Sequence, residues 1–171
     1  MHKNVQDYCE SIKAKHPQFF KNCSVLDVWS LDINGNNRYL FEDCEYIGID
    51  LWEWPWVDKV IDITEDEWNE ELFDTVISTE MLEHCKEFWK ALKNMTSVLK
   101  SWWLLLITSA WEWRPEHWTT NADPSSAPYT NNWYRNILES DFTEFFKFDE
   151  IFTEWEISKK DTDIRFYWIK K

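Results

Sequence analysis

Two aspartates in the first half of the chain stand at the ends of strand-like segments. Asp27 lies near the end of the apolar run Ser24 to Val28, and Asp50 follows the run Glu45 to Ile49. In a nucleotide-binding β-α-β unit the turn after the first strand lies against the ligand, and an acid about 20 residues further on hydrogen-bonds the ribose hydroxyls. The spacing therefore predicts a site of this type, although the first turn lacks the glycine that such a turn usually carries.

A second set of side chains could hold a metal ion. Glu80, Glu83 and His84 have helical spacing, so a helix there would place all three on one face. His117, which follows a later apolar run, could supply a fourth ligand, and such a mixture of carboxylates and imidazoles suits a divalent ion. The alternative is that Glu83 and His84 simply begin a helix. We predict no resident metal and name these four residues as the ones that would hold one.

Short apolar runs bounded by polar turns would bring these residues together. They have the composition of strands buried on both faces: Ser24 to Val28, Glu45 to Ile49, Lys59 to Ile63, Phe73 to Ser78 and Leu104 to Thr108. Segments of helical character lie before and between them: Val5 to Phe20, Asn36 to Glu42, Glu65 to Glu71 and His84 to Leu99. Strands that alternate with helices predict a parallel sheet with helices on both faces.

The pattern changes after Thr108. Ser109 to Asn132 is rich in Pro, Thr, Asn and Ser, and a loop of this length is usually functional or disordered. Asn132 to Phe146 favours one or two helices. Phe148 to Ser158 and Asp163 to Ile169 read as strands, and the short polar turn between them requires an antiparallel pair. We therefore predict a Rossmann-like α/β fold whose seven-stranded sheet is mostly parallel, with an antiparallel final strand.

Composition limits the class of protein. The 171 residues suit one domain, and the formal charge of −14 argues against a broad contact with nucleic acid. The first residues contain no apolar signal, and the longest apolar run, Trp102 to Ile107, is far too short to cross a bilayer. Four cysteines without a CxxC pair point to reduced thiols. We expect a cytoplasmic protein that is not inserted in a membrane.

With glycine read at positions 29, 102 and 103, five segments in order resemble a known family: VLDVGS, IGID, VDKVIDI, FDTVISTEMLEH and VLKSGGLLLIT. They are similar to class I S-adenosylmethionine-dependent methyltransferases of the broad type 11 group. The similarity runs from about Ser24 to Thr108 and continues loosely to the end of the chain. It implies a single methyltransferase domain over residues 1–171, with an N-terminal helix at 1–22, a cofactor-binding core at 23–108, and a substrate loop, helix and β-hairpin at 109–171.

Tryptophan and glycine occur in inverted numbers. The chain has 14 Trp and 2 Gly, whereas average usage predicts roughly 12 Gly at this length. Ten tryptophans stand where the family has glycine or in turn-like settings: Trp29, Trp52, Trp54, Trp56, Trp102, Trp103, Trp111, Trp113, Trp118 and Trp168. Reading these ten as glycine would raise the 2 glycines to 12 and leave 4 tryptophans. Our hypothesis is that the gene reads UGA as glycine and that the sequence as written was translated with UGA as tryptophan.

The resemblance implies a site for S-adenosylmethionine. The residues that it places around the cofactor are Asp27, Trp29, Ser30, Asp50, Leu51, Asp62, Ile63, Thr79 and Glu80. Asp27 and the turn after it would border the methionine part, Asp50 would hold the ribose, and Asp62 would lie near the adenine. The alternative is that these acids merely cap helices or end strands in water. An indole at position 29 would project into or beside the cleft, so we expect the chain as written to bind the cofactor poorly.

The resemblance also implies methyl transfer to an acceptor, which would be a small molecule, a lipid or a glycan. The residues of the long loop and its continuation that could cover the acceptor are Arg114, Glu116, His117, Tyr129, Tyr134 and Arg135. His117 is the candidate general base, although in-line displacement at a sulfonium needs no dedicated base. Two alternatives are a non-catalytic scaffold with this fold and an aromatic-rich binding module, because clusters such as Trp52 to Trp56 can stack on sugars or partners.

Overall fold

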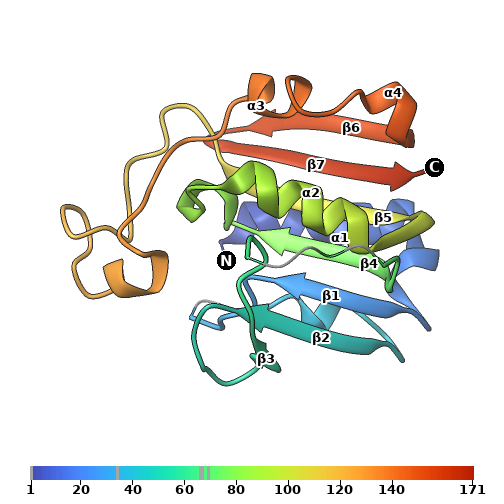
Figure 1. Ribbon diagram of the computed structural model, residues 1–171, viewed down its shortest axis with the longest axis horizontal. Helices are drawn as coiled ribbons and strands as arrows, with labels where there is room; N and C mark the ends of the chain where they lie inside the picture. Colours follow the sequence, from blue (N-terminus) through green and yellow to red (C-terminus); the bar gives the residue numbers. More distant parts are fainter. Residues whose placement is uncertain (1, 34, 66–67, 69) are drawn as a thin grey trace.

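The computed structural model of the protein describes residues 2–33, 35–65, 68 and 70–171. A seven-stranded sheet forms its centre, in the order β3-β2-β1-β4-β5-β7-β6 (Figure 1). The strands are β1 (Ser24–Val28), β2 (Glu45–Asp50), β3 (Lys59–Val60), β4 (Phe73–Thr79), β5 (Leu99–Ala110), β6 (Phe152–Lys160) and β7 (Asp163–Lys170). Strands β1 to β5 pair in parallel, and β7 is antiparallel to both β5 and β6. The predicted fold class is confirmed.

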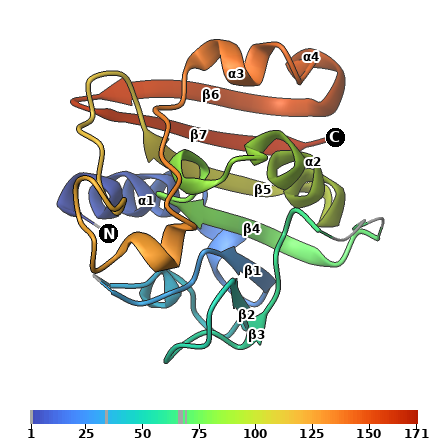
Figure 2. The same ribbon diagram turned by 60° about the vertical axis from the view of Figure 1, so that its left-hand side comes forward.

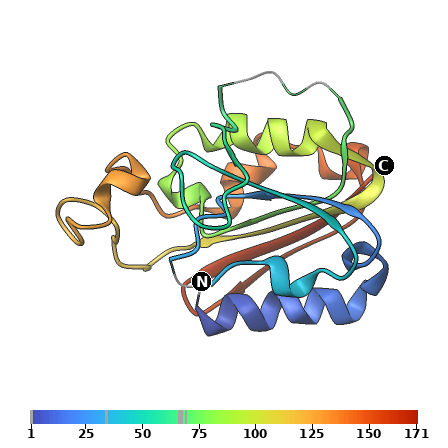
Figure 3. The ribbon, with the colours of Figure 1, turned by 90° about the horizontal axis from the view of Figure 1, so that it is seen from below.

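Helices cover both faces of the sheet. They are α1 (Lys3–Lys15), α2 (Phe88–Val98), α3 (Glu139–Thr143) and α4 (Phe148–Ile151), and single turns of 3₁₀-helix occur at η1 (Pro17–Phe20), η2 (Arg38–Leu40), η3 (Leu82–His84) and η4 (Ala127–Thr130). Helix α1 lies on one face, and α2 lies on the opposite face (Figures 2 and 3). The helix predicted at the N-terminus stops before Pro17, where it gives way to η1, because proline restricts the residue before it and cannot donate a backbone hydrogen bond.

The two faces of β5 show how the sequence builds two cores. Leu104 and Leu106 pack with the buried residues of α1, whereas Leu105 and Ile107 pack with those of α2. Successive side chains of a strand point to opposite faces, so an uninterrupted apolar run is what a doubly covered strand requires. The parallel pairing of β1, β2, β4 and β5 places their carboxyl ends along one edge.

Several predicted elements are wrong or shorter than expected. Asn36 to Glu42 contains only the turn η2, and the strand expected over Lys59 to Ile63 ends at Val60. The helical part of Asn132 to Phe146 is limited to α3. Phe148 begins α4 rather than a strand, because its ring packs on Trp168 and Phe152 in the core. The helix predicted over Glu65 to Glu71 includes residues 66, 67 and 69, which lie outside the described residues.

The segment between β5 and α3 projects past the carboxyl edge of the sheet (Figure 1). It carries η4 and otherwise lacks regular structure among its described residues, as the loss of periodicity after Thr108 predicted. At the same edge of the sheet, Asp161 and Thr162 join β6 to β7 next to the end of β5, which confirms the antiparallel pair. Within the described part of the chain, none of the helices has both the length and the apolar character needed to cross a membrane.

Candidate functional site

Two adjoining cavities open at the carboxyl edge of the sheet. The larger has a volume of about 540 Å³ and is lined by residues that follow β1, β2 and β3, including Asp50, Leu51 and Ile63. The smaller has a volume of about 470 Å³ and lies between β1, the end of β4 and the long loop, with Thr79 and Arg114 in its wall. Open α/β sheets bind ligands at this edge. The ligand site predicted from the sequence therefore lies at the edge of the sheet where the two cavities open.

Asp50 is held in place by the backbone around it. Its Oδ2 accepts a hydrogen bond from the Leu31 N–H at 3.1 Å, and its Oδ1 accepts one from the Leu51 N–H at 2.7 Å. Burial raises the pKa of Asp50 to about 6, although these N–H groups oppose the shift. The carboxylate is thus fixed at the tip of β2 and lines the larger cavity, where its free lone pairs can accept hydrogen bonds from a ligand.

Asp27 and Asp62 take different positions. Asp27 is buried in β1 and accepts hydrogen bonds from Asn37 Nδ2 at 3.1 Å and from the Tyr46 hydroxyl, so its side chain holds the loop after β1 rather than lining either cavity. Burial raises its pKa to about 6. Asp62 lines the larger cavity, but its Oδ1 accepts hydrogen bonds from the backbone and hydroxyl of Thr64. Asp62 could therefore contact a ligand, or it could simply cap the turn that follows β3.

The first turn relies on a glycine in the neighbouring strand. The Ser30 hydroxyl donates to the Ile49 carbonyl at 3.3 Å, and it passes directly over Gly48. A Cβ at Gly48 would stand 2.6 Å from Ser30 Oγ and 2.9 Å from the Trp56 carbonyl oxygen, closer than real Cβ contacts. Ser30 thus ties the turn after β1 to β2 and does not line either cavity.

Trp29 forms a wall that is common to both cavities. Its backbone has φ 80°, in the left-handed region that suits glycine and strains a residue with a Cβ. Four other tryptophans share this conformation: Trp56 (φ 78°), Trp102 (φ 72°), Trp113 (φ 70°) and Trp118 (φ 55°). All five belong to the ten positions at which the sequence suggests glycine, whereas Trp89, Trp133 and Trp155 have negative φ. Backbone geometry thus supports glycine at five of the ten positions.

Trp168 does not fit the turn-like setting that the sequence suggested for it. It lies inside β7, is 0% exposed, and packs against Phe142, Phe152 and Phe166. An indole that fills the core in this way has the environment of a native tryptophan. Trp103 also lies within a strand, β5, and not in a turn.

The spacing of Glu80, Glu83 and His84 does not place them on one helical face. Glu80 has φ 59° and directly follows β4, and the helical structure after it is limited to the single turn η3. Glu80 therefore faces away from the others: its Oε1 accepts a hydrogen bond from Thr108 Oγ1 at 3.0 Å, and its Oε2 lies 3.4 Å from His2 Nε2. Of the four candidate metal ligands named from the sequence, Glu80 therefore does not join the other three.

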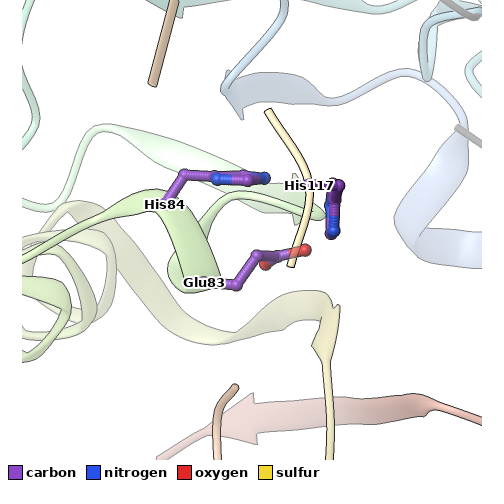
Figure 4. Close-up of side chains that lie close together, drawn as sticks. All are labelled: Glu83, His84 and His117. Atoms are coloured by element: carbon purple, nitrogen blue, oxygen red, sulfur yellow. The ribbon is translucent and has the colours of Figure 1, made fainter. Parts of the chain in front are cut away.

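Glu83, His84 and His117 do converge, as Figure 4 shows. One potential ligand atom from each lies within 4.8 Å of the others. Burial lowers the pKa of His84 to about 3 and that of His117 below its usual value, so both rings are neutral near pH 7. Burial, together with the charge of Glu80, raises the pKa of Glu83 to about 8. The rings of His84 and His117 both line the smaller cavity.

The other loop residues divide into two groups. Arg114 lines the smaller cavity and pairs with Asp163 at 2.7 Å, and the ring of Tyr134 packs behind His84 and His117. The remaining candidates do not line either cavity: Glu116 accepts a hydrogen bond from Thr119, Tyr129 meets Trp52 and Trp54 edge to face, and Arg135 pairs with Asp141.

His2 is a lining residue that the sequence analysis missed. It reaches the smaller cavity from the start of α1 and lies 3.3 Å from an oxygen of Asp163. Hydrogen bonds to Asp163 and Glu80 raise the pKa of His2 to about 9. A helix expected to pack outside the sheet carries no sequence signal that its first residue meets the loop after β5, so only the tertiary structure could reveal this contact.

Comparison of the sequence with protein-family models identifies one family. Residues 18–105 match the family model described as a methyltransferase domain. No curated protein matches the sequence. Among solved structures, the chain resembles 1,6-didemethyltoxoflavin-N1-methyltransferase from Burkholderia thailandensis, with bound 1,6-didemethyltoxoflavin and S-adenosylhomocysteine, at TM-score 0.66 and 16% identity over 98% of this chain and 78% of the other.

Two further structures share the fold. The N-methyltransferase NodS from Bradyrhizobium japonicum WM9, in complex with S-adenosylhomocysteine, matches at TM-score 0.62 and 14% identity over 96% of this chain and 86% of that one. The CurJ carbon methyltransferase matches at TM-score 0.63 and 11% identity over 96% of this chain. This chain spans about half, 53%, of the length of the CurJ structure. At these identities the likeness concerns the fold.

Proposed function

The chain belongs to the class I S-adenosylmethionine-dependent methyltransferases, and on that premise we propose that it transfers a methyl group from S-adenosylmethionine to a small or medium-sized acceptor. The observation that carries the proposal is the fixed carboxylate of Asp50, which opens onto the larger of two adjoining cavities at the carboxyl edge of the sheet. Residues 1–171 would act as one domain, with the core at 23–108 binding the methyl donor and 109–171 covering the acceptor.

The larger cavity has the groups that an adenosine requires. Asp50 can accept hydrogen bonds from two ribose hydroxyls, which is the role of the acid at the tip of the second strand in such folds. Ile63 and Met81 provide apolar surface for a base, and Leu51 and Asp62 lie beside them in the wall. The methionine part would extend past position 29 toward Thr79 and Glu80 in the smaller cavity.

The smaller cavity would hold the acceptor. S-adenosylmethionine supplies an activated methyl group on a sulfonium, so the protein has mainly to orient the acceptor in line with the breaking bond and to exclude water. His117 is neutral and lines this cavity, so its imidazole can take a proton from an acceptor hydroxyl or amine. The net charge of −14 disfavours free nucleic acid, which leaves metabolites, lipids and glycans as acceptor classes.

Trp29 is the one residue that conflicts with donor binding. Its indole stands in the wall between the two cavities, where the donor would have to pass. We therefore also propose that glycine is the encoded residue at the five positive-φ tryptophans, and the codon at position 29 decides this, because UGG there would overturn it. With Trp29 in place the favoured second function is a non-catalytic scaffold of the same fold.

Binding of S-adenosylmethionine is the experiment that tests the proposal. Calorimetric titration of the full chain carrying Trp29→Gly, Trp54→Gly and Trp56→Gly should show one site per chain. Absence of binding by this variant would overturn the proposed function. A variant that binds the donor but releases no S-adenosylhomocysteine with any of a panel of hydroxyl, amine and thiol acceptors would instead favour the non-catalytic scaffold.

A further inference from the structure

The carboxylate of Glu83 is buried with one oxygen unused. Its Oε2 accepts a hydrogen bond from Ser109 Oγ at 2.7 Å, whereas its Oε1 has no hydrogen-bond partner within the part of the chain that the structure describes. The residue is 0% exposed. A buried polar atom of this kind is costly unless something binds it. Figure 4 shows that this carboxylate points to the two imidazoles of the cluster.

The two imidazoles are oriented by backbone carbonyl groups. Nδ1 of His84 lies 3.2 Å from the Trp133 carbonyl oxygen, and Nδ1 of His117 lies 3.0 Å from the Pro115 carbonyl oxygen. A carbonyl oxygen can only accept, so Nδ1 carries the proton in both rings and Nε2 keeps its lone pair. Histidines that bind metals are commonly held in this way, with the second ring nitrogen donating to a carbonyl or carboxylate.

We propose that Glu83, His84 and His117 bind one divalent transition-metal ion, of the class of Zn²⁺ or Mn²⁺, through two imidazoles and one carboxylate. Their potential ligand atoms already lie within 4.8 Å of one another. Ligands at bond lengths of about 2.1 Å around one ion stand roughly 3–3.5 Å apart, so small side-chain rotations close the site. Nitrogen ligands select these ions over Mg²⁺, which prefers oxygen.

Three protein ligands leave coordination positions open. Glu80, which the sequence pattern grouped with Glu83 and His84 as a possible ligand, contacts Thr108 and His2 instead. Because His84 and His117 line the smaller cavity, an open position would face the space assigned above to the acceptor. If the proposed methyl transfer holds, on which this step rests, the ion would bind an oxygen of the acceptor and hold it in place, which favours hydroxyl-bearing acceptors. With the ion bound, His117 would serve as a ligand and not as the general base, because Nε2 is its one unprotonated nitrogen.

Metal titration of the full chain tests this site directly. After treatment with a chelator, the protein should bind one Zn²⁺ or Mn²⁺ per chain in calorimetry and should bind Mg²⁺ at least tenfold more weakly. Glu83→Gln and His117→Gln should each weaken Zn²⁺ binding at least tenfold. Two matched controls, Glu42→Gln and His16→Gln, change an acid and a histidine that pair elsewhere in the fold and should leave the affinity within twofold.

Co²⁺ keeps the test decisive if a variant fails to fold. The unaltered protein loaded with Co²⁺ should show the visible absorption of a nitrogen and oxygen site, and this absorption should disappear on addition of Zn²⁺. Unchanged Zn²⁺ affinity in folded Glu83→Gln or His117→Gln, an equal loss in Glu42→Gln, or no Co²⁺ spectrum would each overturn the site. Ion binding without binding of S-adenosylmethionine would overturn the proposed function and leave the metal site standing. Binding of S-adenosylmethionine without ion binding would overturn the metal site and leave the proposed function standing.

Discussion

The indole of Trp29 lies nearly parallel to the imidazole of His84, with ring centroids 6.1 Å apart and an angle of 11° between the planes. The same indole lines both cavities at the edge of the sheet, and its backbone has a left-handed φ. One side chain thus separates the two spaces that a bound methyl donor would have to connect, and it does so from a conformation that glycine adopts without strain.

Removing the indole should therefore restore donor binding. We expect the triple variant Trp29→Gly, Trp54→Gly and Trp56→Gly to bind S-adenosylmethionine at least tenfold more tightly than the chain as written, because the two cavities then join. Calorimetry on both proteins measures the ratio. The control is Trp155→Gly, which removes an indole from β6 at the opposite edge of the sheet and should leave donor affinity unchanged. Equal affinities in the triple variant and the chain as written would refute the prediction.

Two exposed tryptophans allow the backbone strain to be tested without a change in the core. Trp102 is 67% exposed and Trp113 is 86% exposed, and both have positive φ. Glycine at each should raise the free energy of unfolding by about 1 kcal/mol, since a left-handed conformation costs a residue with a Cβ roughly that much. Urea unfolding of the single variants measures the change.

The matched control for strain is Trp89, which is 40% exposed but lies in α2. Trp89→Gly should lower the free energy of unfolding by about 0.5–1 kcal/mol, because glycine is a poor helix former. A loss of stability in Trp102→Gly and Trp113→Gly similar to that of the control would count against glycine at these positions.

Trp168 should respond with the opposite sign. It fills the core between β7 and the phenylalanines of α3 and β6, so Trp168→Gly should lower the free energy of unfolding by about 4 kcal/mol or more. Chemical denaturation is the measurement, with far-ultraviolet circular dichroism to detect loss of the fold. A neutral or stabilising effect would return position 168 to the group of misread glycines.

The residues that were predictable and those that were not differ in the range of their interactions. The apolar run at 104–108 defines β5 by itself, and the polar turn before Asp163 fixes an antiparallel hairpin, because both depend on neighbours in the sequence. The position of Glu80 depends on Thr108 and His2, which are distant in the chain, so helical spacing alone placed it wrongly. The same holds for His2 itself, whose partners Glu80 and Asp163 follow β4 and begin β7.

Charge placement at Asp50 leads to a prediction for donor affinity. Asp50→Asn keeps the shape but removes an acceptor, so in the glycine-restored background it should weaken binding of S-adenosylmethionine by about tenfold or more, equivalent to about 1.4 kcal/mol. The pKa of Asp50, about 6, implies that affinity in the glycine-restored background without this change also falls as pH drops through 6. Asp32→Asn, an acid in the loop after β1 that lines neither cavity, is the control. Full affinity in the folded Asp50→Asn variant would remove Asp50 from the site.

His2 links the start of α1 to the loop after β5 through charge. Its pKa is raised from 6.5 to about 9 by hydrogen bonds to Asp163 and Glu80, so folding favours the protonated ring. The resulting stabilisation is fully present below pH 6.5 and is lost as pH rises through 9. Because the ring is partly exposed, we expect a contribution of about 1 kcal/mol or less.

The variant His2→Gln isolates this contribution from other groups that titrate in the same range. The difference in free energy of unfolding between the unaltered protein and His2→Gln should be largest near pH 6 and should shrink toward pH 10, because only the histidine loses its charge. Arg114 also pairs with Asp163, so the loop keeps this contact with β7 in the variant. Unfolding curves at several pH values measure the difference, and a difference that grows with pH would show that His2 is neutral in the folded protein.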